Sequence, residues 1–266
     1  MHFLLRFSFL SGFLLLWCLP TALRAADDSP APQLHEPWHQ VLVRHVTPDG
    51  RLDYSGMRKE VDRVRSYLHS LRQVKPNPKT WTPDQSKAFW INAYNAAATY
   101  LVLQHYPVTS INDIRVKGAG GSKSPWEAPV LNVGGQAYSL NQVEVLLRNQ
   151  FHDPRVHFAL MYAAVSCPPL LAGAYDGAHL NEQLDEQARR FINDPAYNEL
   201  QPNQVRLSGL FEAYATEFGS GAYLLDFLNR YARTPVLPTA RIEYLSFSWA
   251  LNDRTSLSRS QALGQH

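Results

Sequence analysis

The chain has 266 residues, of which 45% are hydrophobic, and it carries 25 Lys and Arg against 23 Asp and Glu. This length suits one large domain or two small ones, and the hydrophobic content allows a sizeable core. Nucleic acid is not indicated as a partner, because such binding needs a concentrated basic face and the sequence has no long run of like charges.

The first 26 residues have the layout of a cleaved signal peptide: a short basic start, an apolar run over 7–19, and small residues before a pair of acids. The apolar run is shorter than the ~20 residues that a membrane-crossing helix needs. We therefore expect export to the periplasm or secretion, with no stable membrane span after cleavage. Cleavage near Ala25 removes Arg6 and Arg24 and no acidic residue, so the mature chain is expected to be electrically neutral.

A flexible lead-in is expected over 27–37, and the sequence HEPWH begins within it. An H-E-x-x-H pattern binds zinc when both histidines lie on one face of a helix. Here Pro37 lies between them, and proline is tolerated only in the first turn of a helix. A helix that begins there leaves His35 outside, and no third ligand is specified. The sequence therefore predicts neither a metal site nor a cofactor.

The first predicted elements are helical. Apolar residues at helical spacing indicate helices over 38–46 and 55–71. The sequence TPDQ at 82–85 then has the form of a capping box with proline at the first helical position, which predicts the start of a helix that runs to about residue 106. This helix is apolar nearly all round, which indicates burial.

One stripe of that helix is polar and contains Asn92 and Asn95. A buried amide costs about 1–3 kcal/mol if it lacks hydrogen bonds. These two side chains are therefore expected either to line a polar cavity that holds a ligand or to hold neighbouring loops in place.

The remaining pattern is mixed. It predicts a hairpin that turns at Gly134 and Gly135, a capped helix over 140–151, and a buried apolar segment over 153–170 whose length allows either a helix or a strand. Further elements are expected as follows: a helix at 177–194, a short hairpin at 197–208, two helices at 209–218 and 221–232 separated near Gly219, and a strand at 240–252.

This order of elements shows no repeats and no evident boundary. It predicts one α+β domain over 38–253, with helices packed on a small, mostly antiparallel sheet. A flexible tail is expected over 254–266.

Four stretches carry a resemblance to a known family: AFWINAYNA at 88–96, SLNQVEVLLR at 139–148, DPRVHFAL and SCPPL within 153–170, and LSFSWALN at 245–252. In this order they resemble the family catalogued as domain of unknown function 547, over about 38–252. The resemblance implies no activity, because the family is named for the lack of one. It implies that the following residues occupy motif positions: Asn92, Tyr94, Asn95, Glu144, Arg148, His157, Cys167 and Asn252. Members often carry a histidine directly after the motif glutamate, where this chain has Val145.

Cys167 has no disulfide partner if Cys18 leaves with the signal peptide. It is then either a nucleophile, which needs a base or cation to favour its thiolate, or a buried and inert residue. Pro168 and Pro169 place it at the end of an element. In a continuous helix, His157 lies ~15 Å away, and in a strand roughly twice as far. A catalytic pair needs about 3–4 Å, so it requires a bend between the two residues.

Three interpretations stay open, and they differ in whether the protein is an enzyme. The first is an exported cysteine-dependent hydrolase or acyl transferase for peptide-like or amide substrates, with Cys167 as nucleophile and His157 as base. The second is a non-catalytic module that binds a small molecule or peptide. The third assigns all these residues to the core.

The candidate binding residues are Asn92, Tyr94, Asn95, Glu144 and Arg148. Paired-carboxylate chemistry would instead need two of three acids to converge: Glu144, Asp185 and Glu217. The sequence does not specify an oligomeric state.

Overall fold

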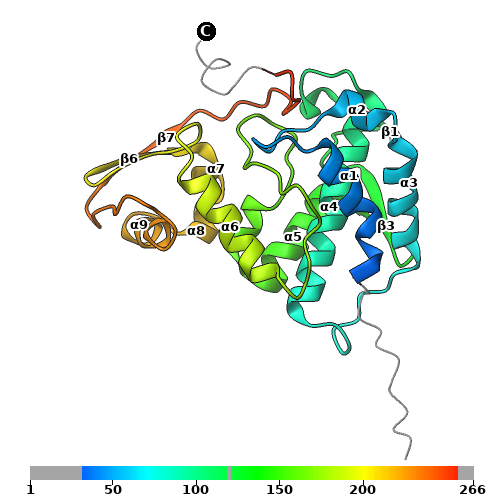
Figure 1. Ribbon diagram of the computed structural model, residues 1–266, viewed down its shortest axis with the longest axis horizontal. Coiled ribbons are helices and arrows are strands. Elements are labelled where there is room, and N and C mark those ends of the chain that lie inside the picture. Colours follow the sequence, from blue (N-terminus) through cyan, green and yellow to red (C-terminus); the bar gives the residue numbers. More distant parts are fainter. Residues whose placement is uncertain (1–31, 119–120, 257–266) are drawn as a thin grey trace, which may run out of the picture.

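Helix α4 (Pro83–His105) runs through one half of the molecule, where several other helices and a β-hairpin pack against it, while the C-terminal elements lie to the left in Figure 1. The structure is a computed structural model, and it describes residues 32–118 and 121–256. The helix begins as predicted: the Thr82 hydroxyl accepts a hydrogen bond from the Gln85 backbone N–H, and the Gln85 side chain accepts one from the Thr82 N–H. Nearly every residue from Ser86 to Leu103 is buried, so α4 supplies the centre of the core.

Shorter helices cover α4 on several sides. Within the described residues, the other α-helices are α1 (Glu36–His45), α2 (Tyr54–Arg58), α3 (Val61–Ser70), α5 (Leu140–Phe151), α6 (Leu180–Ile192), α7 (Gly209–Ala213), α8 (Ala215–Phe218) and α9 (Ala222–Asn229). Short 3-10 helices are η1 (Pro32–Leu34), η2 (Leu71–Gln73), η3 (Ile111–Asp113) and η4 (Pro154–Phe158). Helices α2, α3, α5 and α6 contact α4 directly.

The strands of the described residues form three small sheets. Antiparallel pairs join β1 (Val116–Gly118) to β2 (Gly121–Lys123), and β3 (Pro129–Val133) to β4 (Gln136–Ser139). In the third sheet, β6 (Gln204–Ser208) is antiparallel to β5 (Glu199–Gln201) and parallel to β7 (Arg241–Leu245). The prediction of one α+β domain with mostly antiparallel strands is confirmed.

The segment 153–170 is neither a long helix nor a strand. It forms η4 and then a series of turns in which every residue from 156 to 170 is buried. Ala163 has a φ of 53°, in the left-handed region that costs a non-glycine residue about 1–3 kcal/mol. The segment therefore folds back within the core, instead of running straight as both predicted forms would.

Several predicted boundaries shift. The first helix begins at Glu36, so Pro37 lies in its first turn and His35 lies just outside it. The predicted helix over 55–71 is divided into α2, α3 and η2, the one over 209–218 is divided into α7 and α8, and the predicted strand over 240–252 is regular only in β7. The expected signal peptide over 1–26, the lead-in as far as 31 and the tail from 257 onward lie outside the described residues. Among the described helices, none is long and apolar enough to cross a membrane.

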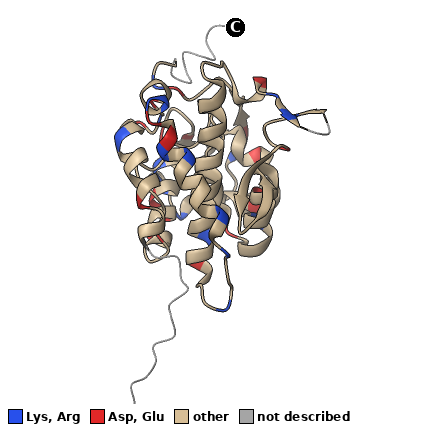
Figure 2. Cartoon of the chain, turned by 90° about the vertical axis from the view of Figure 1, so that its right-hand side faces the viewer, with Lys and Arg blue, Asp and Glu red and all other residues tan. Residues whose placement is uncertain are grey.

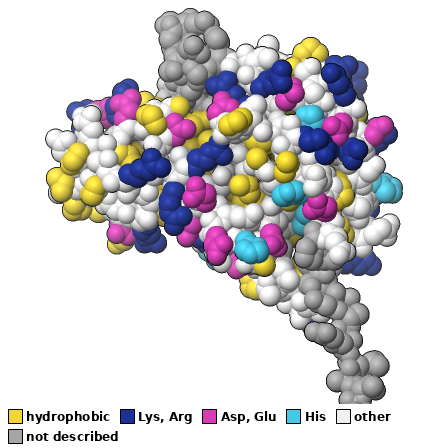
Figure 3. Space-filling view, in the orientation of Figure 1, with side chains coloured by type: hydrophobic (Ala, Val, Ile, Leu, Met, Phe, Trp, Pro, Cys, Tyr) yellow, Lys and Arg dark blue, Asp and Glu magenta, His cyan; other side chains and the backbone are white. Residues whose placement is uncertain are grey.

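Charged residues lie mainly on the outer elements and loops (Figure 2). On the face seen in Figure 3, basic and acidic side chains are mixed rather than separated into patches. This arrangement agrees with the near balance of 25 basic and 23 acidic residues in the sequence.

Candidate functional site

The two asparagines of the α4 stripe hold loops in place. Asn95 donates from Nδ2 to the Ala159 carbonyl oxygen (2.9 Å) and accepts at Oδ1 from the Met161 N–H (2.9 Å). Asn92 makes the same pair of bonds to the backbone of Tyr175, at 2.8 and 2.9 Å. Both side chains are buried, and each amide bonds to backbone through both its nitrogen and its oxygen. Of the two predicted roles, these bonds show loop tethering.

The Asn95 tether fixes the start of the turns that carry Cys167. The C-terminal segment holds the same turns further along: Val165 N–H donates to the Ala250 carbonyl oxygen (2.8 Å), and the Ser166 hydroxyl accepts from the Ser248 N–H (2.8 Å). Two segments that are distant in sequence thus hold the turns that carry the thiol.

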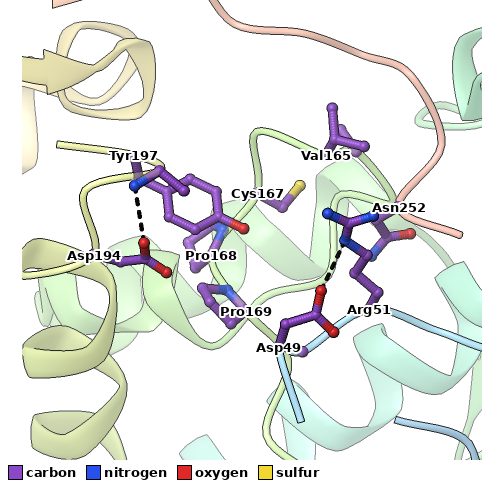
Figure 4. A pocket seen from close by; sticks show the side chains of 12 residues that line it. Asp49, Arg51, Val165, Cys167, Pro168, Pro169, Asp194, Tyr197 and Asn252 are labelled. Carbon is purple, nitrogen blue, oxygen red and sulfur yellow. Dashed lines mark hydrogen bonds and ion pairs between the residues drawn. The ribbon is translucent and has the colours of Figure 1, made fainter. Parts of the chain in front are cut away.

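Cys167 lines a pocket with a volume of about 90 Å³, which we call the Cys167 pocket (Figure 4). Figure 4 shows Arg51 and Asn252 on one side of the thiol and Asp194 and Tyr197 on the other. The lining residues are Asp49, Gly50, Arg51, Ala164, Val165, Cys167, Pro168, Pro169, Asp194, Ala196, Tyr197 and Asn252. A single water needs about 10–15 Å³ of such volume, so the pocket has room for several groups of that size.

The Cys167 thiol is neutral at physiological pH. Its side chain is 3% exposed, and burial raises its pKa to about 12, although hydrogen bonds from the backbone of Ala164 and Tyr162 oppose the shift. A reactive cysteine needs the opposite, a pKa lowered by a base, a cation or a helix N-terminus. In this geometry the thiol is a small apolar group with a weak donor.

Charged and polar groups surround the thiol. Arg51 forms an ion pair with Asp49 (Nε to Oδ2, 3.0 Å) and donates to the Ser256 carbonyl oxygen. Asn252 is 5% exposed, and its Oδ1 accepts from the Tyr54 hydroxyl (2.8 Å), which orients its amide nitrogen. The pocket thus combines a cation, an amide and carboxylates above an apolar floor.

The predicted pairing of His157 with Cys167 is wrong. The His157 ring is 1% exposed and makes hydrogen bonds through both nitrogens, Nδ1 with the Tyr162 hydroxyl (3.0 Å) and Nε2 with Glu217 Oε2. It also stacks on Tyr214, with ring centroids 3.7 Å apart. Both ring nitrogens are therefore occupied, and neither is directed at the thiol.

His157 instead belongs to a second polar centre, which we call the Glu217 cluster: Glu144, Arg148, His157, Tyr162, Tyr214 and Glu217. Arg148 Nη2 donates to Glu217 Oε1 (2.5 Å), and Arg148 Nη1 lies 4.0 Å from Glu144 Oε1. The guanidinium also lies over the Tyr214 ring, 5.6 Å from its centroid. These contacts join helices α5 and α8 to η4.

The two carboxyls of this cluster have opposite pKa shifts. Burial raises the pKa of Glu144 above its ordinary value, although His157, the Tyr214 hydroxyl and Arg148 oppose the shift. Burial also acts to raise the pKa of Glu217, but His157 and Arg148 outweigh it and hold the pKa at about 2. Glu144 thus favours its protonated form more than Glu217 does, and the two carboxyls could share acid and base roles.

The structure thus divides the predicted site residues. Glu144, Arg148 and His157 come together, and Tyr94 lies fully buried beside them, where the charge of Glu144 contributes to raising the pKa of its hydroxyl. The Tyr94 hydroxyl has no hydrogen-bond partner among the described residues. Val145, the residue after the motif glutamate, is 48% exposed.

Sequence reasoning missed most of the pocket wall. Arg51 and Asp49 lie in a turn after α1, and Asp194 follows α6, so nothing local connects them to Cys167. Glu217 was one of three candidate carboxylates, and it does converge with Glu144 on Arg148. The remaining one, Asp185, instead accepts from Arg155 (2.7 Å).

The histidines of HEPWH have separate partners. His35 Nδ1 is hydrogen-bonded to the Tyr67 hydroxyl (2.7 Å), and His39 Nδ1 accepts from the Ala174 N–H (3.2 Å). Over residues 32–118 and 121–256, no group of three or more His, Cys, Asp or Glu side chains is placed to hold a metal ion.

Residues 78–192 match the model of a family described as "Protein of unknown function, DUF547". Comparisons with curated proteins and with solved structures gave no match. The matched range contains α4, α5, η4, the Cys167 turns and α6. Arg51, Asp194, Asn252 and Glu217 lie outside it.

Proposed function

Since the chain belongs, through residues 78–192, to the family described as Protein of unknown function, DUF547, and this description names no activity, we propose a function from the pocket itself. The protein is an exported, non-catalytic binding module that holds a small zwitterionic ligand, such as a free amino acid or the end of a peptide, in the Cys167 pocket. A fold alone does not specify a function, so the proposal rests on the groups that line this pocket.

The observation that carries the proposal is the neutral thiol at the centre of a charged pocket. The pKa of Cys167 is raised to about 12 by burial, and His157 is bonded elsewhere. This supports a pocket that holds a ligand without attacking it. Arg51 supplies a cation for an anionic group, and Asp194 supplies an anion for an ammonium group.

The size of the pocket supports a small ligand. A volume of about 90 Å³ accommodates several heavy atoms but not a folded partner. Pro168, Pro169 and Val165 provide an apolar surface for a short aliphatic group, while the Asn252 amide provides a donor.

Calorimetry and thermal unfolding with four probes test the proposal: glycine, L-alanine, D-alanine and the dipeptide of alanine. A ligand at 100 times its Kd stabilises the folded state by about 2.7 kcal/mol, which raises Tm by roughly 5–10 °C for a chain of this size. Acetate and methylammonium, which carry one charge each, should stabilise the protein less.

Arg51→Gln and Asp194→Asn should each abolish this stabilisation. Asp194→Asn keeps an oxygen that can accept from the Ala196 N–H, as Asp194 does at 2.9 Å. Arg206→Gln is the matched control, because Arg206 forms an exposed ion pair with Glu199 and does not line the pocket. The proposal fails if no probe binds at millimolar concentration, or if binding survives both pocket substitutions.

A second candidate function is acid–base hydrolysis at the Glu217 cluster, and the opposite pKa shifts of Glu144 and Glu217 favour it. A screen of amide and ester substrates tests it. Activity that persists in Cys167→Ser and is lost in Glu144→Gln would support this function, whereas activity lost in Cys167→Ser would favour thiol chemistry instead.

A further inference from the structure

Strand β3 of the β3–β4 hairpin has no second strand partner among the described residues. Its turn consists of Gly134 and Gly135, whose φ angles of 59° and 87° match the type I′ turn of a two-residue hairpin. Within its two-stranded sheet, β3 pairs only with β4.

The register fixes which backbone groups of β3 face away from β4. Val133 pairs with Gln136 across the turn, and in such a hairpin the residues that flank the turn exchange both hydrogen bonds. The preceding residue, Asn132, therefore directs its own N–H and C=O away from β4. Its side-chain Oδ1 is also buried without a hydrogen-bond partner among the described residues. The backbone of Asn132 thus presents one donor and one acceptor that β4 does not use.

A groove with a volume of about 390 Å³ lies along this hairpin, and we call it the β3 groove. One wall is formed by β3 and Ala137, and the facing wall by α3, η2 and Tyr100. The lining residues are Arg65, Leu68, His69, Arg72, Tyr100, Pro129, Val130, Leu131, Asn132 and Ala137.

The facing wall of the groove is basic. Arg65 is 62% exposed and forms an ion pair with Asp62 at 2.7 Å, while Arg72 makes no ion pair within the described residues. No acidic side chain lines the groove. His69 also lines the groove. The electrostatic field of the groove therefore favours an anionic occupant.

We infer that the β3 groove binds an acidic peptide in an extended conformation, which pairs with the free edge of β3 as an added strand while its carboxylates face Arg65 and Arg72. Main-chain hydrogen bonds supply affinity in this mode of recognition, and side chains at alternate positions supply specificity. Pro129 has no backbone N–H and the register of β3 is irregular between Pro129 and Leu131, so we expect the peptide backbone to pair with β3 at Asn132 and its side chains to reach the basic wall. This site is separate from the Cys167 pocket and independent of the function proposed for it.

The test uses the full chain and a fluorescein-labelled peptide that alternates Asp and Val over six residues. Fluorescence anisotropy should show saturable binding that weakens as salt is raised, because exposed charges are screened. A peptide with Lys in place of Asp should not bind. A peptide with the same sequence but N-methylated at alternate residues loses its donors, and should bind at least about tenfold more weakly.

Matched substitutions locate the site. Arg65→Gln combined with Arg72→Gln should weaken binding about tenfold or more. Arg63→Gln is the control. Arg63 lies on the same helix as Arg65, is 64% exposed and forms an ion pair with Glu60, but it does not line the groove. The inference is overturned if the peptide does not bind at 1 mM protein, on the order of the weakest specific affinities. It is also overturned if the N-methylated peptide binds equally well, or if the double substitution acts no more strongly than the control.

Discussion

Replacing Glu217 by Gln should weaken the contact between α5, η4 and α8, and the loss should depend on pH. Glu217 Oε1 accepts from Arg148 and Oε2 is bonded to His157, and these partners hold its pKa at about 2, against an ordinary value of 4.5. A carboxyl with this difference contributes at most about 3 kcal/mol to the free energy of unfolding at pH 7. The Arg148 side chain is 33% exposed, and solvent screening reduces the expected contribution to about 2 kcal/mol.

The sign of the pH dependence follows from the lowered pKa. Because the folded state holds the carboxylate more strongly than the unfolded state does, the stabilisation is complete above pH 4.5 and is lost as the pH falls toward 2. Urea unfolding of the wild type and Glu217→Gln at pH 7, 5 and 3 measures this. The difference should be about 2 kcal/mol at pH 7 and 5, and less than about 1 kcal/mol at pH 3.

Glu212→Gln is the matched control, because Glu212 is an exposed acid nearby in sequence with no ion pair among the described residues. It should change stability by less than about 0.5 kcal/mol. A Glu217→Gln effect that is as small as this, or one that is equal at pH 3 and pH 7, would refute the role given to the Glu217 cluster.

Two further substitutions test the support of the Cys167 turns. Asn95→Ala leaves two buried backbone groups without the bonds that Asn95 makes to them, and should lower the free energy of unfolding by about 3 kcal/mol in urea. Asn149→Ala is the control: Asn149 is exposed, so its replacement should have little effect. Gly50→Ala places a Cβ 2.4 Å from the Pro169 Cβ at a φ of 83°, while Gly135→Ala has a similar φ of 87° and open space. Gly50→Ala should therefore cost more than Gly135→Ala by at least about 1 kcal/mol in the same assay, and equal costs would show that no steric contact forms at the pocket.

Local signals in the sequence predicted the elements whose cause is local. Thr82 and Gln85 form the capping box that their spacing indicates, and Gly134 and Gly135 make the predicted turn. The burial of α4 also followed from its apolar surface. Each of these features depends on residues within one or two turns of the chain.

The site itself could not be read in this way. The spacing indicated that His157 and Cys167 can pair only if the segment between them bends, and the segment does bend, but the partner of His157 is Glu217, which lies 60 residues further along the chain. Likewise, Arg51 and Asn252 reach Cys167 only because distant segments pack together. The asparagine stripe was ambiguous for a related reason: an amide that lines a cavity and one that binds a loop have the same sequence pattern.

The alkylation rate of Cys167 with iodoacetamide, measured on the folded protein from pH 6 to 11, tests most directly the claim that this thiol is a neutral part of a binding pocket. The pKa of about 12 predicts slow alkylation below pH 10, the same in His157→Ala as in the wild type, and fast alkylation only in urea. A thiolate that titrates below the free value of about 8.5, with a pKa that rises in His157→Ala, would contradict the account and establish a cysteine–histidine site.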